Sequence, residues 1–238
     1  MKRILEICAN SVQSARAAQQ GGAQRIELCQ NLEQGGITPS YGLIQRVQAV
    51  LTIPAFVLIR PRPGGFCYDA DEQALMLADV AACRDLGCAG VVLGALNAAG
   101  QIDEACCQAL IAAAGSMQIT FHRAFDVCPD QARALETIID LGCHRVLTSG
   151  GHPSAVAGQE QLARLVRQAA GRLSIMPGAG ITPLNARALA EHTGAHEFHT
   201  SAKRQVMSAA AAVPTEFDAT LLESDAAIVA EVVAQLNF

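Results

Sequence analysis

Four times in this chain a glycine followed by Ala or Cys stands just ahead of a short apolar segment. The glycines are Gly22, Gly87, Gly142 and Gly194, at intervals of 65, 55 and 52 residues. One βαβ unit takes about 30 residues, so each interval has room for two strand–helix units. Glycine suits the left-handed residue that ends a helix before the chain re-enters a sheet. Four such joints therefore predict eight parallel strands, with the even-numbered strands directly after the glycines.

Length and composition agree with a parallel barrel. The chain has 238 residues, and a (β/α)8 barrel takes about 250. Hydrophobic residues make up 51% and charged residues 16%, as expected when both faces of the strands are covered. We predict one α/β domain over 1–238, a TIM barrel at about 3–201 with a C-terminal tail at 203–238. The tail is expected to hold an Ala-rich loop and one closing helix from about Ser224.

The predicted strands decide where a site should lie. They are expected at 3–8, 25–29, 55–60, 90–94, 118–122, 145–149, 173–176 and 196–200. Active sites of such barrels lie at the C-terminal ends of the strands. The search for functional residues therefore concentrates on those ends and the loops that follow them.

Location and partner class follow from the start of the chain and from its charge. The first residues, Met1 to Glu6, are too short and too soon acidic for a signal peptide. Without a secretory signal the nine cysteines are expected to stay reduced, so we expect a cytoplasmic protein. A net charge of −5 without basic clusters argues against nucleic acid as a partner. No apolar run approaches 18 residues, which argues against a membrane span.

Ionisable side chains gather at the predicted strand ends. The candidates for acid–base catalysis are Glu6, Glu27, His122, Asp126 and His199. Burying such groups unpaired is costly, so we expect them to meet one another and a polar ligand. Glu27 or Glu6 would act as base, and His122 as the acid or as the partner that orients the base. Two alternatives remain open: a structural ion-pair layer, and a divalent metal held by Glu6, Glu27 and His199.

Arginines and glycine-rich turns suggest an anion site. Arg60, Arg62 and Arg123 follow predicted strands, and the planar guanidinium matches carboxylate or phosphate. The alternative is that one of them pairs with Glu6 or Glu27.

Backbone N–H groups offer a second route to anion binding. Ser149-Gly150 and Gly178-Ala179-Gly180 are expected after strands 6 and 7, and Thr182-Pro183 is expected to start a helix whose N-terminus favours an anion. The alternative is that these are tight turns only.

Three cysteines fall at strand ends or in a loop beside them. Cys8 and Cys29 lie on neighbouring predicted strands and can approach each other, and Cys67 lies in a loop at the same end. Thiolates are soft ligands that select Cu(I), so these three are the candidate metal ligands. The alternative is that Cys8 and Cys29 are ordinary buried thiols.

Several blocks of sequence, in order, resemble one family. They are Glu6-Ile7-Cys8, 22–29 (GAQRIELC), 35–40 (GGITPS), Ile59-Arg60-Pro61-Arg62, 121–126 (FHRAFD), 146–150 (VLTSG) and Gly178-Ala179-Gly180-Ile181. Together they are similar to the CutC family over about 4–201. The resemblance implies a (β/α)8 barrel, a cytosolic protein, a role in copper homeostasis with Cu(I) bound through cysteine, and a homodimer.

Three functional hypotheses remain open at this stage. The first is a copper protein, which requires thiols close together at a strand end. The second is a TIM-barrel enzyme that performs acid–base chemistry on a small anionic substrate, either phosphorylated or a carboxylate. The third is a binding or regulatory protein that keeps a barrel pocket, since the fold hosts many functions.

Overall fold

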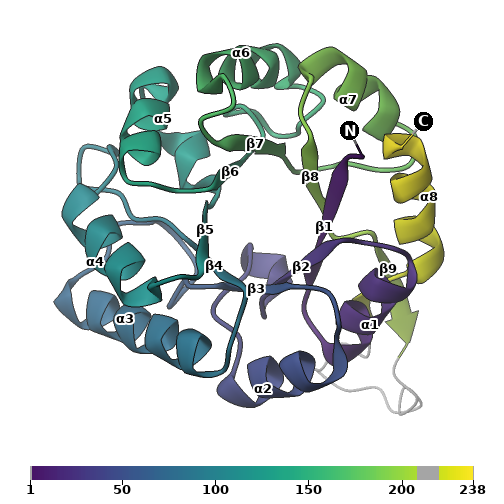
Figure 1. The fold of residues 1–238 in the computed structure, drawn as a ribbon, viewed down its shortest axis with the longest axis horizontal. Coiled ribbons are helices and arrows are strands. Elements are labelled where there is room, and N and C mark those ends of the chain that lie inside the picture. The colour runs from purple at the N-terminus through teal and green to yellow at the C-terminus, as the bar shows by residue number, and fades with distance from the viewer. Residues whose placement is uncertain (1, 208–219, 238) are drawn as a thin grey trace.

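A computed structural model describes residues 2–207 and 220–237. Figure 1 shows a ring of strands around a central axis with helices on the outside. Eight parallel strands are ordered β7-β6-β5-β4-β3-β2-β1-β8, so neighbours in sequence are neighbours in the sheet. The predicted TIM barrel is confirmed. The strands are β1 (Ile4–Ala9), β2 (Arg25–Leu28), β3 (Ala55–Leu58), β4 (Gly90–Leu93), β5 (Gln118–Phe121), β6 (Arg145–Thr148), β7 (Ser174–Pro177) and β8 (Glu197–Thr200).

The helices form the outer layer and are capped by side chains at most of their starts. For example, Asp69 and Glu72 form a reciprocal capping box at the start of the helix after β3. In the described residues no helix is long and apolar enough to cross a membrane. The helices are α1 (Val12–Gln20), α2 (Tyr41–Val50), α3 (Ala70–Asp85), α4 (Glu104–Ala114), α5 (Gln131–Asp140), α6 (Gln159–Ala169), α7 (Ala186–Thr193) and α8 (Ala226–Leu236), with short 3-10 turns η1 (Leu32–Gln34) and η2 (Arg123–Val127).

The four glycine joints have the backbone conformation that the sequence predicted. Gly22, Gly87, Gly142 and Gly194 have φ of +88°, +72°, +79° and +70°. Each follows α1, α3, α5 or α7 and precedes an even-numbered strand. The left-handed conformation turns the chain from the helix layer back into the barrel.

Two hydrophobic clusters pack against the strands, one outside the barrel and one inside it. The larger cluster lies between strands and helices and includes the fully buried Ile7, Ile26 and Phe198. The smaller cluster lies among inward-facing side chains and consists of Cys8, Cys29, Phe56, Leu58 and Val92. Alternation along each strand separates the two sets. Charged side chains that also point into the barrel are therefore shielded from water.

The described part of the C-terminal tail contains two strands that the sequence did not predict. β9 (Lys203–Met207) and β10 (Thr220–Ser224) pair antiparallel, a hairpin that was not expected. β9 is exposed and mostly polar, so it carries no apolar alternation to reveal a strand. The closing helix is confirmed as α8, which is capped by Asp225 and packs beside α1 and α7 (Figure 1). Most of the predicted Ala-rich loop, at 208–219, lies outside the described residues.

Replacing a joint glycine should cost stability through the backbone alone. A Cβ at Gly142 would meet no atom within 4 Å, yet its φ is +79°. We expect Gly142→Ala to lower the free energy of unfolding by about 1 kcal/mol, because alanine disfavours the left-handed region. Gly42→Ala, at an open position of α2 with ordinary φ, should instead raise it by up to about 1 kcal/mol. Urea unfolding of both variants measures this, and equal effects would contradict the conformational explanation.

Candidate functional site

Three neighbouring strands bring a thiol, a carboxyl and an imidazole together inside the barrel. Cys8 on β1 is the register partner of Glu27 on β2, and His199 stands on β8, on the other side of β1. One ligand atom of each residue lies within 4.8 Å of the others, and all three side chains are buried. The Nε2 atom of His199 is 3.5 Å from Oε2 of Glu27. We call this group the Cys8–Glu27–His199 cluster.

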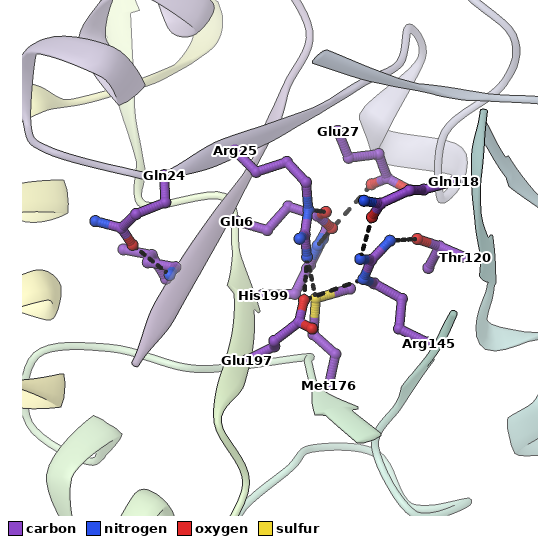
Figure 2. Close-up of polar contacts among 11 residues, drawn as sticks. Glu6, Gln24, Arg25, Glu27, Gln118, Thr120, Arg145, Met176, Glu197 and His199 are labelled. Carbon is purple, nitrogen blue, oxygen red and sulfur yellow. Dashed lines mark hydrogen bonds and ion pairs between the residues drawn. The ribbon is translucent and has the colours of Figure 1, made fainter. Parts of the chain in front are cut away.

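Glu6 fixes the orientation of His199 from the neighbouring strand (Figure 2). It is fully buried, and its Oε1 lies 2.8 Å from Nδ1 of His199 while its Oε2 accepts from Nε of Arg25. Burial alone would raise the pKa of Glu6, but Arg25 and His199 outweigh it and hold the pKa at about 2. An ionised carboxylate can only accept, so Nδ1 of His199 donates. Nε2 is thereby directed at Glu27.

A layer of paired charges lies beneath the Cys8–Glu27–His199 cluster. Arg25 donates to Glu197 at 2.5 Å, and Arg145 donates to the same oxygen at 3.0 Å. Both guanidinium groups stack on Phe56, each 4.9 Å from the ring centroid. Arg145 also reaches Gln118 and Thr120, and Arg25 reaches Met176 (Figure 2). An ion-pair layer is therefore present beneath the cluster, but Glu6 is the one catalytic candidate from the sequence that belongs to it.

The pKa values of the three cluster residues are all raised above their ordinary values. Burial raises the pKa of Glu27. Burial would lower the pKa of His199, but the bond to Glu6 and the charges of Glu27 and Glu6 outweigh it and raise the pKa. The contact with Cys29, followed by burial, raises the pKa of Cys8 well above its usual range. The Sγ atoms of Cys8 and Cys29 are 3.4 Å apart, so the two thiols approach each other as the strand pairing allowed.

One cavity of about 950 Å³ opens over the cluster at the C-terminal ends of the strands. Most of the sequence-predicted site residues line it: Cys8, Glu27, Arg60, His122, Arg123, Asp126, Gly180 and His199. Apolar side chains of Leu32, Leu58, Phe66 and Leu147 share its wall. The structure therefore brings acid–base, thiol and arginine candidates to one open space.

Other candidates lie outside this cavity. Arg62 pairs with Glu72 and donates to the carbonyl of Cys67, so it is directed into its own loop. Cys67 is exposed, whereas Cys8 and Cys29 are buried. Glu6 is sealed beneath His199, so it orients that ring and lies out of reach of a ligand.

Several backbone N–H groups of the glycine-rich turns after β6 and β7 already have partners within the protein. Asp126 accepts from the N–H of Ser149, and the N–H of Gly150 donates to Thr148, so both are already bonded. The N–H of Gly178 donates to the carbonyl of Thr148. A Cβ at Gly178 would lie 2.5 Å from Leu147, so there is no room for a side chain at this position.

The helix expected to begin at Thr182-Pro183 begins later. α7 starts at Ala186, and Thr182 to Asn185 form a turn in which Asn185 bonds back to Gly180 and Thr182. The prediction of a helix N-terminus at Thr182 is therefore wrong. A Thr-Pro pair suits a turn as well as a helix start, and here the turn's side-chain bonds decide it.

Sequence reasoning missed Arg25, Arg145 and Phe66. The first two stand on the inward face of β2 and β6, as their alternation with buried Ile26 and Val146 shows. That alternation was a usable signal. Phe66 stacks against His122 with ring centroids 5.0 Å apart, a contact made by a loop that no sequence pattern places.

Breaking the ion pair of Glu6 should lower the free energy of unfolding by an amount that depends on pH. We expect Glu6→Gln to lower the free energy of unfolding at pH 7 by about 3 kcal/mol or more, because Arg25 loses a buried partner. The pKa of Glu6 is about 2 against an ordinary 4.5, so its contribution is present above pH 4.5 and is lost as the pH falls toward 2. The deficit of Glu6→Gln should therefore shrink at pH 3 in urea unfolding.

Glu72→Gln is the matched control for this prediction. Glutamine keeps the capping bond to Asp69, and only the exposed pair with Arg62 is weakened. We expect a change of less than about 1 kcal/mol. A deficit for Glu6→Gln that stays constant from pH 7 to pH 3 would contradict the assignment of a charged Glu6.

Comparison with known proteins identifies the family. The model of the CutC family matches residues 3–204. The family protein CutC of Xanthomonas axonopodis pv. citri (strain 306) is 56% identical over 211 residues, which are 89% of this chain and 87% of that protein. The crystal structure of CutC from Streptococcus agalactiae, named for copper homeostasis, matches with a TM-score of 0.81 and 32% identity over 84% of this chain and 98% of that one. A thiamine phosphate pyrophosphorylase from Pyrococcus furiosus shares the fold alone, with a TM-score of 0.63 and 15% identity over 99% of this chain and 96% of that one. The chain belongs to the CutC family.

Proposed function

We propose that this CutC protein takes part in copper homeostasis by binding a metal ion at the Cys8–Glu27–His199 cluster. The observation that carries the proposal is the convergence of three ligand atoms within 4.8 Å of one another at the base of an open cavity. Copper is the metal that the family relationship favours. In this proposal copper is the cargo of the protein.

The donor set suits copper. A thiolate and an imidazole are both ligands that copper accepts, and soft thiolates select Cu(I). Cys29, 3.4 Å from Cys8, offers a second sulfur beside the cluster. Glu27 adds a carboxylate whose charge would favour a divalent ion.

Glu6 has the position of a supporting carboxylate. Histidine ligands commonly donate their second N–H to a carboxylate, which fixes the ring and raises its basicity. Glu6 accepts from Nδ1 of His199 and is itself held by Arg25. His199 is therefore presented with Nε2 toward the cavity before any ion arrives.

The copper proposal is tested by anaerobic Cu(I) titration against a competing chelator. We expect wild type to bind Cu(I) stoichiometrically. Cys8→Ser should bind at least about 100-fold more weakly, because loss of a ligand should cost at least as much as loss of a supporting group. Cys29→Ser should weaken binding as well, since its sulfur adjoins Cys8.

Cys67→Ser is the matched control, because this thiol is exposed and lies outside the cavity lining. It should bind Cu(I) as wild type does. Weak binding that is equal in wild type and Cys8→Ser would overturn the copper proposal, and so would a loss confined to Cys67→Ser.

A second candidate function is acid–base catalysis on a small anionic molecule. Glu27, with its raised pKa, faces His199 across 3.5 Å in a cavity far larger than an ion needs. Exchange of carbon-bound protons for solvent deuterium in a panel of small carboxylates and phosphates tests it by NMR. Exchange that is abolished in Glu27→Gln supports catalysis, and the absence of exchange across the panel contradicts it.

A cytoplasmic location and a homodimer stay predictions.

A further inference from the structure

Two further buried side chains belong to the lining of the same cavity, one a cation and the other a hydrogen-bond donor. Arg60 follows β3 and His122 follows β5, and both line the cavity. Phe66 lies between them: the guanidinium carbon of Arg60 is 5.2 Å from its ring centroid, and the ring of His122 is 5.0 Å away. Neither side chain belongs to the Cys8–Glu27–His199 cluster.

Arg60 carries a buried charge that no carboxylate balances in the described part of the chain. Only 6% of the residue is exposed. Its Nη1 and Nη2 atoms donate to the carbonyls of Gln34, Gly36 and Gly64, at 2.7 to 3.1 Å. Its Nε has no hydrogen-bond partner. A buried guanidinium that meets only neutral acceptors keeps a field that attracts an anion.

His122 presents a donor beside this charge. Its Nδ1 accepts from the N–H of Ala124 at 3.2 Å, so the proton of the neutral ring is on Nε2. Burial, followed by the charge of Arg60, lowers the pKa of His122 to about 3, so the ring is neutral at pH 7. Nε2 is buried and has no hydrogen-bond partner among the residues that the structure describes. An unpaired buried donor of this kind is uncommon and calls for an acceptor.

The surrounding glycines make room for these two side chains. A Cβ at Gly94 would lie 2.8 Å from the ring of His122, and a Cβ at Gly35 would lie 3.3 Å from Nη1 of Arg60. Gly35 and Gly36 also take the positive φ values that wrap their loop around the guanidinium. The backbone is therefore shaped to hold both groups in place.

We propose that Arg60 and His122 form a binding site for the oxyanion group, carboxylate or phosphate, of a small organic molecule. The oxyanion accepts from Nε of Arg60 and Nε2 of His122 when the ring of Phe66 turns aside, and the carbon part of the molecule packs on Phe66 and Leu58. The site does not depend on metal binding. It supplies the ligand class for the acid–base candidate, yet it stands as a binding site even if that chemistry fails.

Calorimetric titration of the metal-free protein, in the presence of a chelator, tests the proposal. The probes are glycerol 3-phosphate, malate, inorganic phosphate and uncharged glycerol. We expect saturable 1:1 binding of glycerol 3-phosphate or malate, tighter than inorganic phosphate by at least about tenfold, and none of glycerol. Preference between the two organic probes identifies phosphate or carboxylate as the natural group.

Variants locate the binding. Arg60→Gln and His122→Asn should each weaken binding by about tenfold or more, since hydrogen bonds in which at least one partner is ionised, here the oxyanion, are the strong ones. Asparagine keeps an acceptor for Ala124, so His122→Asn tests the site even if Arg60→Gln fails to fold. Arg62→Gln, two residues away and paired with Glu72 outside the cavity, should bind as wild type does.

Two results of the binding titrations would overturn the proposal. One is the absence of saturable binding for both organic probes. The other is equal weakening by Arg60→Gln and Arg62→Gln, which would mean a general charge effect. In the wild type, the NMR chemical shift of the Nε2 proton of His122 should change as the organic probe is added. An unchanged chemical shift at saturation would also overturn the proposal.

Discussion

The charged pairing of Glu6 with Arg25 is the interaction on which the rest of the site depends. Both side chains are buried inside the barrel, where an isolated charge would be very unfavourable. Arg25 bridges Glu6 to Glu197, and Arg145 completes the layer from the far side of the barrel. The layer joins side chains of β1, β2, β6 and β8 across the axis. The layer therefore lies beneath the functional groups and supports them.

The arrangement of side chains inside the barrel follows from their alternation along each strand. Glu6 and Cys8 on β1 point the same way, two residues apart, so the carboxylate that orients His199 and the thiol that faces it come from one strand. The Cys8–Glu27–His199 cluster and the Arg60–His122 pair are different residues that line one cavity. The two proposals therefore assign the metal and the organic anion to different residues of the same cavity.

Much of the fold was readable in the sequence because its cause is local. A glycine that needs positive φ marks each joint, as Gly87 and Gly194 show, and apolar runs mark the strands. The proximity of Cys8 and Cys29 followed from their places on neighbouring strands. The partner of Glu6 did not follow, because pairing across a barrel depends on stagger and side-chain length: Arg25, not Arg60 or Arg62, reaches it. Thr182-Pro183 misled because the bonds of Asn185 stabilise a turn there.

The most direct measurement is a crystal structure of the copper-loaded protein with anomalous data collected at the copper absorption edge. The account predicts a single strong peak within bonding distance of Sγ of Cys8 and Nε2 of His199, with Glu6 still bonded to Nδ1 of that ring. A peak at the exposed Cys67, or no peak inside the barrel, would contradict it.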